Sequence, residues 1–252
     1  MRFLRAPPLP AGTRLDTPLP PLSIIMNGLK HLDGQCLPAV FPSFQQLMAQ
    51  NGNQSGFHKV AEADFPTRFG HFRIYGFEGK YQGEIEEAVV LEMGNLHSPE
   101  PALVRVHSQC LTGDVFHSLR CDCRAQLELS LEQIAEEGRG LLIYEHQEGR
   151  GIGLSNKLRA YELQDAGADT VEANLQLGFK ADHRSYELPV DILRFFGIRS
   201  VRLLSNNPEK IEALESAGIR VVERVPCVVP PVGSSAGYLR TKKEKLGHLL
   251  DL

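Results

Sequence analysis

The chain has 252 residues, of which 42% are hydrophobic and 23% are charged, so it is long enough and apolar enough to bury a substantial core. Its net charge of −4 argues against a general nucleic-acid surface, which is usually basic, and no apolar run approaches the ~18 residues of a membrane span. The five cysteines are an odd number with three of them clustered, which does not make a disulfide framework, so we expect a protein of the reducing cytoplasm.

A proline-rich segment opens the chain. Half of the sixteen prolines lie in the first 42 residues, and turn-forming residues follow at 51–56. This composition predicts a disordered extension over residues 1–58 and a single folded domain over residues 59–252. Cys36 lies in the extension without a second cysteine nearby, and we assign it no role.

Beyond Val60 the sequence alternates between short β-prone runs and segments with helical periodicity. The runs that we expect to form strands are 71–77, 87–93, 102–107, 141–144, 201–204 and 219–225. The segments with apolar residues at helical spacing, which we expect to form helices, are 126–137, 154–166, 190–196, 208–217 and 238–250. The stretch between the second and third of these helices has no clear period, and we expect a loop at 225–237. The alternation predicts an α/β fold in which helices cover mixed β-sheets.

Three of the five cysteines lie within fourteen residues, because Cys110 is followed by ten residues and then by Cys-Asp-Cys at 121–123. Three thiolates at this spacing predict a metal site, and zinc is the natural ion because thiolates prefer zinc or copper(I). The glycine, arginines and aspartate around them disfavour the alternative of three small buried core residues. Water in the fourth tetrahedral position would make the zinc catalytic, whereas His107 or His117 there would make it structural. The spacing fits both arrangements.

A glycine-rich turn, Glu148-Gly-Arg-Gly-Ile-Gly153, follows an expected strand and opens an expected helix. Its glycines permit close approach of the backbone, its amides can point at an anion, and Arg150 offers a planar fork to phosphate oxygens. The turn is not the dinucleotide-binding fingerprint of Rossmann folds, because the third glycine comes one residue early. The pattern favours a local phosphate site.

Three further polar segments are candidates for the same chemistry. Asn207 is suited to cap a helix that begins at Pro208, and Lys210 then lies in a first turn that favours anions, although a plain capped helix is equally consistent. The tripeptide Asp-His-Arg at 182–184 is typical of a solvated turn, but near an activated water its carboxylate is a natural base. The basic residues of the helix expected at 238–250 favour a solvated face over a phosphate site.

Seven motifs occur in a fixed order between residues 60 and 250: Arg-Val-His-Ser-Gln-Cys-Leu-Thr-Gly-Asp, Arg-Cys-Asp-Cys, Gln-Glu-Gly-Arg-Gly-Ile-Gly-Leu, Thr-Val-Glu-Ala-Asn, Leu-Gly-Phe-Lys-Ala-Asp-His-Arg, Asn-Asn-Pro-Glu-Lys and Lys-Leu-Gly-His-Leu-Leu. Together with their spacing they resemble GTP cyclohydrolase II, the first enzyme of riboflavin biosynthesis. The resemblance identifies residues 59–252 as a GTP cyclohydrolase II catalytic domain.

The resemblance implies a hydrolase that opens the imidazole ring of GTP at carbon 8 and releases formate and pyrophosphate. The product would be 2,5-diamino-6-hydroxy-4-(5-phosphoribosylamino)pyrimidine. It also implies one Zn²⁺ per chain, held by Cys110, Cys121 and Cys123, which activates the attacking water. Mg²⁺ is expected to accompany the triphosphate.

By the same resemblance, Asp182 matches the family's proton acceptor, Arg184 its proposed nucleophile toward the α-phosphate, and Tyr161 a tyrosine that assists the addition of water to the ring. The residues that match GTP contacts are Arg105, Val106, His107, Ser108, Gln109, Gln126, Glu148, Gly149, Arg150, Thr170, Ser205 and Lys210. Two of these depart from the usual pattern, since glutamate is common at position 109 and threonine at position 205. Both replacements keep a polar group of similar reach, and we interpret them as tolerated variation.

The expected partners are GTP and a second copy of the chain in a homodimer, without nucleic acid or membrane. Bifunctional relatives carry a dihydroxybutanone phosphate synthase domain upstream, and 58 residues are fewer than the ~100 of a usual domain, so we expect that activity to be absent. Two alternatives are a paralogue that retains the formyl group and a non-catalytic, zinc-stabilised GTP-binding protein. Tyr161 argues against the first, and the full set of Asp182, Arg184 and Tyr161 argues against the second.

Overall fold

The computed structural model describes residues 56–250, except for residues 181 and 231–234. The chain divides into two units, Met1–Gln50 and Asn51–Leu252, and the described residues all belong to the second. The disordered extension expected at 1–58, with Cys36, therefore lies outside the described residues apart from its last three positions, of which His58 begins the first strand. None of the described helices is long and apolar enough to cross a membrane.

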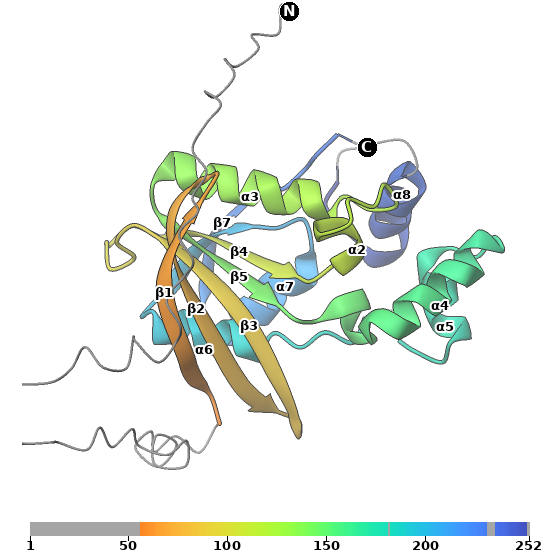
Figure 1. The fold of residues 1–252 in the computed structure, drawn as a ribbon, viewed down its shortest axis with the longest axis horizontal. Helices are drawn as coiled ribbons and strands as arrows, with labels where there is room; N and C mark the ends of the chain where they lie inside the picture. The colour runs from red at the N-terminus through yellow and green to blue at the C-terminus, as the bar shows by residue number, and fades with distance from the viewer. Residues whose placement is uncertain (1–55, 181, 231–234, 251–252) are drawn as a thin grey trace, which may run out of the picture. The chain divides into compact units, whose positions relative to one another are not determined.

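The strands of the described region form one seven-stranded mixed sheet (Figure 1). In chain order they are β1 (His58–Thr67), β2 (Gly70–Tyr81), β3 (Glu84–Met93), β4 (Ala102–Ser108), β5 (Gly140–Glu145), β6 (Ser200–Leu204) and β7 (Arg220–Val225). Their order across the sheet is β1-β2-β3-β5-β4-β6-β7. Neighbours are antiparallel from β1 to β5 and parallel from β5 to β7. The α/β class expected from the sequence is confirmed, with one sheet rather than several.

Helices connect the strands from β4 onward and cover both faces of the sheet. In the described region they are α2 (Leu111–Asp114), α3 (Cys123–Glu137), the short 3-10 helix η2 (Glu148–Gly151), α4 (Gly153–Asp165), α5 (Thr170–Gln176), α6 (Glu187–Phe195), α7 (Pro208–Ser216) and α8 (Ser235–Leu246). Figure 1 shows α3 on one side of the sheet and α6 and α7 on the other. Because α3 joins the parallel pair β4 and β5, and α7 joins β6 and β7, each is a crossover helix of the kind that parallel strands require.

Alternate residues of the central strands pack into two different hydrophobic clusters. In β5, Leu141 and Ile143 belong to the larger cluster, together with Ile192 of α6. Leu142, between them, belongs to the smaller cluster, together with Ile134 of α3. Successive side chains of a strand point to opposite faces, so a strand covered on both faces needs a continuous apolar run. This run made β5 recognisable from the sequence.

The antiparallel half of the sheet extends beyond the strands expected from the sequence. β1 is an edge strand whose side chains are mostly exposed, so its sequence has no apolar face to reveal it. β2 and β3 meet at Gln82 and Gly83, which both have positive φ, 51° and 94°. Such a two-residue turn matches the twist of a hairpin. The polar residues near this turn hid the ends of both strands, which were expected only at 71–77 and 87–93.

Several helices differ from the sequence expectation. α2 was not expected, and α3 and α6 each begin three residues before the expected positions 126 and 190. α5 lies in the stretch that was expected to be irregular, and Asp169 caps it in a reciprocal capping box with Glu172. This signal was present in the sequence. α8 begins and ends earlier than the helix expected at 238–250, and the chain leaves it at Gly247, which has a left-handed φ of 64°.

The start of β5 lies so close to β4 that only glycine fits there. A Cβ at Gly140 would lie 2.7 Å from the Leu103 carbonyl oxygen and 3.0 Å from the side chain of Ile134. We expect Gly140→Ala to lower the free energy of unfolding by about 1–3 kcal/mol, the usual cost of overpacking, as measured by urea unfolding. Gly76→Ala is the matched control, because its Cβ would meet Val60 at an ordinary 3.7 Å. Equal losses for the two variants would contradict this account.

Candidate metal centre and anion pocket

The carboxyl ends of three parallel strands lie side by side at one edge of the sheet. β4 pairs in parallel with both β5 and β6, and the last residues of β4 and β5, Ser108 and Glu145, are directly paired. In open α/β sheets this edge is where ligands bind. A pocket opens here, lined by the segments that follow the three strands and by residues of α4, α5 and the C-terminal part of the chain.

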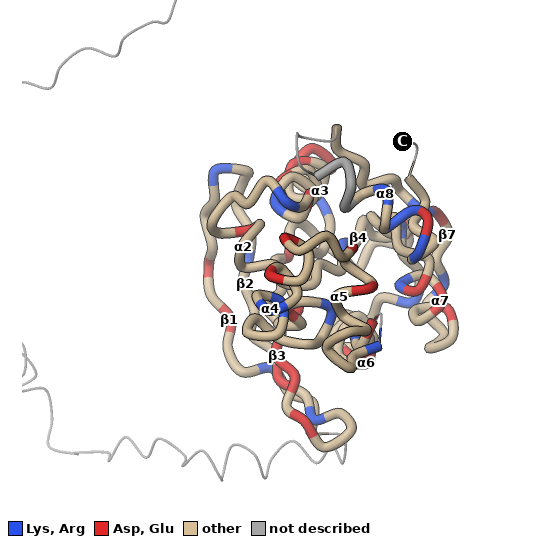
Figure 2. The backbone as a smooth tube through the Cα atoms, turned by 90° about the vertical axis from the view of Figure 1, so that its right-hand side faces the viewer, with Lys and Arg blue, Asp and Glu red and all other residues tan. Residues whose placement is uncertain are grey.

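The pocket is strongly cationic, although the chain as a whole carries a net charge of −4. Within the described residues, its lining includes a single carboxylate, that of Glu148, and seven lysine and arginine side chains. These are Arg105, Arg120, Arg150, Lys157, Arg184, Lys210 and Lys242. Figure 2 views this edge of the sheet and shows basic positions on α4 and α8, which both contribute to the lining. The local charge favours an anionic ligand.

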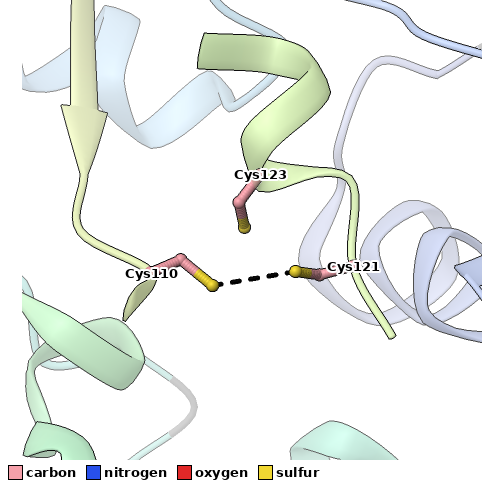
Figure 3. Close-up of side chains that lie close together, drawn as sticks. All are labelled: Cys110, Cys121 and Cys123. Atoms are coloured by element: carbon pink, nitrogen blue, oxygen red, sulfur yellow. Dashed lines mark hydrogen bonds between the residues drawn. The ribbon is translucent and has the colours of Figure 1, made fainter. Parts of the chain in front are cut away.

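Three cysteines converge at one side of the pocket (Figure 3). The Sγ atoms of Cys110, Cys121 and Cys123 lie within 4.8 Å of one another, and those of Cys110 and Cys121 are 3.7 Å apart. A tetrahedral zinc with Zn–S bonds of ~2.3 Å requires sulfur separations of ~3.8 Å. Gly113 leaves room for the sulfurs, since a Cβ there would lie 2.8 Å from Cys121 Sγ and 3.1 Å from Cys110 Sγ. The cluster therefore fits a thiolate-bound tetrahedral ion.

Hydrogen bonding among the thiols makes them unequal. Bonds from Cys121 and Cys123 lower the pKa of Cys110, and the nearby charge of Lys157 lowers it further. The interaction with Cys110 raises the pKa of Cys121 to about 11. Thiolates are the form that binds metal, so a cation at the centre of the cluster would displace the shared protons.

Lys157 and Glu148 brace the cysteine cluster. The Nζ atom of Lys157 lies 3.1 Å from Cys110 Sγ and 2.7 Å from Glu148 Oε1. The other carboxylate oxygen of Glu148 accepts a hydrogen bond from the Leu111 amide at 2.6 Å. The residue after Cys110 is thereby tied to the glycine-rich turn. Lys157 was not predicted from the sequence, although it lies one helical turn before Tyr161 on the same face of α4.

Neither candidate histidine is a fourth ligand of the cysteine cluster. His107 is buried, with Nδ1 3.3 Å from Arg105 Nη2 and Nε2 3.4 Å from Asp114 Oδ1. Burial lowers the pKa of His107, which keeps its ring neutral. His117 is exposed. Within the described residues, the three cysteines are the only group of at least three His, Cys, Asp or Glu side chains close enough to share an ion, which favours an open fourth position.

The glycine-rich turn presents an unpaired guanidinium to the pocket. Arg150 has a left-handed φ of 62°, and its Nη1 and Nη2 atoms are buried without a hydrogen-bond partner among the described residues. The turn also packs against the 182–184 segment, because the His183 amide donates to the Arg150 carbonyl at 3.0 Å. A Cβ at Gly151 would lie 3.0 Å from the His183 backbone. A buried cation without an acceptor is costly, so the geometry favours a bound anion.

Asp182 and Arg184 pair with each other beside the pocket. Arg184 Nε donates to Asp182 Oδ1 at 2.9 Å, its Nη2 donates to the other carboxylate oxygen, and its Nη1 lies 3.3 Å from Ser108 Oγ. Burial opposes ionisation of Asp182, but the hydrogen bonds and the charge of Arg184 outweigh this effect, so the pKa of Asp182 is lowered. Gln147 holds this segment in place through its side chain. Its Nε2 atom donates to the Ser185 carbonyl at 2.8 Å, and its Oε1 atom accepts from the Ser185 backbone amide at 3.0 Å.

Lys210 reaches the pocket from the first turn of α7, which Asn207 caps as expected. Its Nζ atom donates to the Val106 carbonyl at 2.8 Å. Burial lowers the pKa of Lys210, and the charge of Arg184 lowers it further. Burial also raises the pKa of Glu145 to about 7, against the opposing charges of Lys210 and Arg184. An anion beside Lys210 would favour its charged form.

Most of the predicted site residues meet in this pocket. Those that line it are Arg105, His107, Ser108, Gln109, Cys110, Cys121, Cys123, Gln126, Glu148, Gly149, Arg150, Tyr161, Thr170, Arg184, Ser205 and Lys210. Val106 and Asp182 are not part of the lining. The side chain of Val106 packs in the larger hydrophobic cluster, and Asp182 is hydrogen-bonded to the lining residue Arg184.

Several lining residues were not predicted as site residues. They are Arg120, Gln147, Ile152, Lys157, Ala160, Gln164, Asn174, Asn206, Asn207, Lys242 and His248. The solvated face expected for the last basic helix is wrong for Lys242, which is 8% exposed and donates to Asp122 at 2.9 Å. No local pattern in the sequence predicts this contact, because the two residues are 120 positions apart.

The fold and the pocket define an α/β protein suited to bind a metal ion and an anionic ligand side by side. Residues 58–226 match the family model of GTP cyclohydrolase II. Because this match spans more than half of the chain, the chain belongs to the GTP cyclohydrolase II family, a family of hydrolases. The resemblance found in the sequence motifs is confirmed.

Relatives from several bacteria agree with this assignment. The chain is 56% identical over 192 residues to GTP cyclohydrolase-2 of Actinobacillus succinogenes, which covers 76% of this chain and 88% of the relative. It is 56% identical to GTP cyclohydrolase-2 of Proteus mirabilis over 76% of this chain and 96% of the relative, and 54% identical to that of Haemophilus influenzae (strain PittGG) over 76% and 88%. The solved structure of RibBX, a two-domain 3,4-dihydroxy-2-butanone 4-phosphate synthase from A. baumannii, aligns with a TM-score of only 0.33 and 18% identity over 63% of this chain and 36% of that one.

We expect Gly113→Ala to weaken metal binding, because the added methyl group would lie 2.8 Å from Cys121 Sγ and displace it. Cobalt(II) titration, followed by thiolate-to-metal charge-transfer absorption, should reveal about tenfold weaker affinity, the lower end of an overpacking cost. Val115→Ala is the control, because Val115 is exposed on the same loop. If both variants bind cobalt as tightly as the unmodified protein, the gap at Gly113 is not required.

Proposed function

We propose that the chain hydrolyses GTP, opening the guanine imidazole ring with release of formate and pyrophosphate, as the first step of riboflavin biosynthesis. The observation that carries this proposal is the presence, in one pocket, of three converging thiols and the unpaired Arg150 guanidinium. Hydrolysis at a ring carbon needs an activated water, and a triphosphate needs cations. The names of the relatives, GTP cyclohydrolase-2, support the same substrate. The product would be 2,5-diamino-6-hydroxy-4-(5-phosphoribosylamino)pyrimidine.

Zinc is the ion that we propose for Cys110, Cys121 and Cys123, with one ion per chain. The 3.7 Å sulfur separation and the gap at Gly113 support a tetrahedral thiolate-bound ion. Bound there, zinc would supply Lewis-acid activation of water. Mg²⁺ is proposed to accompany the triphosphate, because it prefers phosphate and water oxygens to thiolates.

The cations of the pocket are proposed to hold the phosphate chain. Arg184 Nη1 and Lys210 Nζ each lie 3.3 Å from Ser108 Oγ, so two positive charges converge on one hydroxyl. Like charges this close repel each other, and a phosphate between them would relieve the repulsion. Arg150 adds a guanidinium whose terminal nitrogens have no partner among the described residues. Cations fixed in position by the fold are the arrangement that stabilises developing charge most effectively.

The other predicted contacts are proposed to orient the nucleotide. They are Arg105, His107, Ser108, Gln109, Gln126, Glu148, Gly149, Thr170 and Ser205, with Val106 contributing through its backbone. Glu148 differs from the other contacts because both of its carboxylate oxygens already accept hydrogen bonds within the protein. The donors are Leu111, Gly149 and Lys157. Its part is to hold the turn and the cysteine loop together.

Tyr161 and Asp182 are proposed as the hydrogen-bond donor and the proton acceptor of the reaction. The Tyr161 hydroxyl lies 3.2 Å from Thr112 Oγ1, and burial raises its pKa, so it stays a phenol that can donate a hydrogen bond during water addition. Asp182 is proposed as the proton acceptor. Its bonds to Arg184 make it a weak base, and a phosphate that draws Arg184 away would raise its basicity. This pairing would make the base competent only when substrate is bound.

The remaining expectations about partners stay predictions. We propose a homodimer, with GTP as the small-molecule substrate and without nucleic-acid or membrane partners. The proposed location is the cytoplasm, where thiols stay reduced. Light scattering of the purified protein would give the mass of the assembly.

Purified zinc-loaded protein with GTP and Mg²⁺ should release formate and pyrophosphate. Cys121→Ser should lose both bound zinc and formate release, because two thiolates hold zinc far less well than three. The matched control is Cys227→Ser, which replaces a buried free cysteine outside the cluster and should retain both. Metal analysis and an enzymatic formate assay provide the readouts. Full formate release by a metal-free Cys121→Ser protein would rule out catalytic zinc.

The products of the same incubation separate the alternatives. A ring-opened pyrimidine that keeps its formyl group, with no free formate, would identify the paralogue activity. Tight GTP binding without any product would indicate a zinc-stabilised GTP-binding protein. Either result would overturn the proposed reaction.

Arg184 is better suited to stabilise charge than to attack phosphorus. Burial opposes its charge, but the interactions with Tyr186 and Asp182 outweigh this effect and raise its pKa. A protonated guanidinium is a poor nucleophile and a good partner for the leaving pyrophosphate. The family mechanism nevertheless proposes attack by this arginine on the α-phosphate, so the two roles need a direct test.

We expect Arg184→Ala to lower pyrophosphate release by at least ~100-fold, the usual cost of losing one transition-state donor, while zinc content stays unchanged. Arg199→Ala, at an exposed arginine outside the pocket lining, is the control. Mass spectrometry of the unmodified protein quenched during turnover separates the two roles. An adduct of GMP mass on Arg184 would establish covalent attack and contradict a purely electrostatic role.

A further inference from the structure

The C-terminal segment, residues 239–250, has one backbone hydrogen bond that closes the end of α8 and a second that joins it to the pocket. After α8 the His248 amide donates to the Lys242 carbonyl at 3.0 Å. The next amide, that of Leu249, donates to the Asn206 carbonyl at 2.9 Å. Asn206 lies in the loop between β6 and α7 and lines the pocket. The segment is thus fixed against one of the loops that build the site.

A buried ion pair anchors the same segment to the cysteine loop. Lys242 is 8% exposed, and its Nζ atom lies 2.9 Å from Asp122 Oδ1. Asp122 stands between two of the clustered cysteines in sequence, and its carboxylate also accepts a hydrogen bond from the side-chain amide of Gln126. Buried ion pairs add little net stability, but they specify geometry, because a partner left alone is strongly unfavourable. Lys242 therefore fixes where the C-terminal segment lies relative to the pocket.

These contacts of the C-terminal segment place His248 in the pocket lining. Its ring makes no hydrogen bond to any described residue. Burial, followed by the charges of Lys242, Arg184 and Arg150, lowers the pKa of His248 to about 3, and the charge of Asp122 opposes this shift. A neutral imidazole has one N–H donor and one acceptor nitrogen. Since three of the four charged groups named around it are cations, the ligand group that suits the donor is an anion.

We propose that His248 is a further binding residue of this pocket, donating a hydrogen bond to the phosphate chain of the nucleotide, and that Lys242 is a positioning residue for the segment that carries it. The identity of the ligand as a nucleotide rests on the proposed function, whereas the contact itself is one between an imidazole and a phosphate. The family match ends at residue 226, so the segment lies beyond the matched region.

Inorganic tripolyphosphate is the probe that isolates this contact from the nucleoside. Isothermal titration calorimetry of the zinc-loaded full-length protein should give about tenfold weaker binding for His248→Ala, the order expected for one hydrogen bond to a charged group. His248→Gln, which keeps a neutral donor, should recover most of the affinity. His97→Ala, at an exposed histidine outside the pocket lining, should bind like the unmodified protein.

Two results would overturn the contact. One is that His248→Ala binds tripolyphosphate with unmodified affinity, and the other is that the unmodified protein does not bind it at all. In the first case, weaker binding of guanosine by the same variant would assign His248 to the base or ribose.

The positioning role of Lys242 has its own readout in amide hydrogen exchange. Lys242→Met should weaken tripolyphosphate binding and also speed exchange of the Leu249 amide, whereas His248→Ala should leave that exchange unchanged. Lys243→Met makes the same change in charge at an exposed position of the same helix and should alter neither. If Lys242 acts through His248, the double variant will bind no more weakly than the weaker single variant. Equal effects of the two lysine variants would overturn the positioning role.

These measurements are independent of turnover. A protein that binds tripolyphosphate through His248 but releases neither formate nor pyrophosphate from GTP would contradict the proposed function and leave the contact standing. If the unmodified protein is fully active and the His248→Ala variant keeps its affinity for tripolyphosphate, the proposed function stands and the contact is contradicted.

Discussion

The parallel pairing of β4 with β5 and β6 is the constraint on which the site depends. It brings three strand ends to one edge of the sheet, and each is followed by a different chemistry: the cysteine loop after β4, the glycine-rich turn after β5 and the capped α7 after β6. A slip of one residue in any of these strands would turn its buried side chains to the opposite face. Because both faces are covered by apolar clusters, the register is strongly specified. The core therefore sets the geometry of the chemistry.

The same edge concentrates positive charge, of which only part is paired with carboxylates of the described residues. Arg150 has terminal nitrogens without partners among the described residues, and the pKa of Lys210 is lowered by burial and by Arg184. Groups held in this way are destabilising in the absence of a ligand and strongly attractive to an anion that replaces their lost hydration. The pocket is thus organised for a polyanion, and the hydrophobic clusters on the two sides of the sheet supply the stability that permits it.

The sequence revealed those parts of the site that are local in the chain. The cysteine spacing, the glycine-rich turn and the Asn207 cap of α7 each depend on neighbouring residues, and each was recognised from residue types alone. The family resemblance added Tyr161, because no pattern in the neighbouring sequence indicates a functional role for this residue. Lys157 beside Cys110 could not be found in this way, because such a contact exists only once the chain has folded. The α5 helix is different, since its capping box was a local signal that the periodicity search overlooked.

The ion pair between Lys242 and Asp122 also bears on the order in which the protein is assembled during synthesis. Its partners are 120 residues apart, so at ~5–20 residues per second the ribosome adds Lys242 roughly 6–24 s after Asp122. During that interval the nascent cysteine loop carries its carboxylate without the ammonium that neutralises it in the finished protein. The cysteine loop, although made early, therefore gains its Lys242 partner only when the chain has been extended by a further 120 residues.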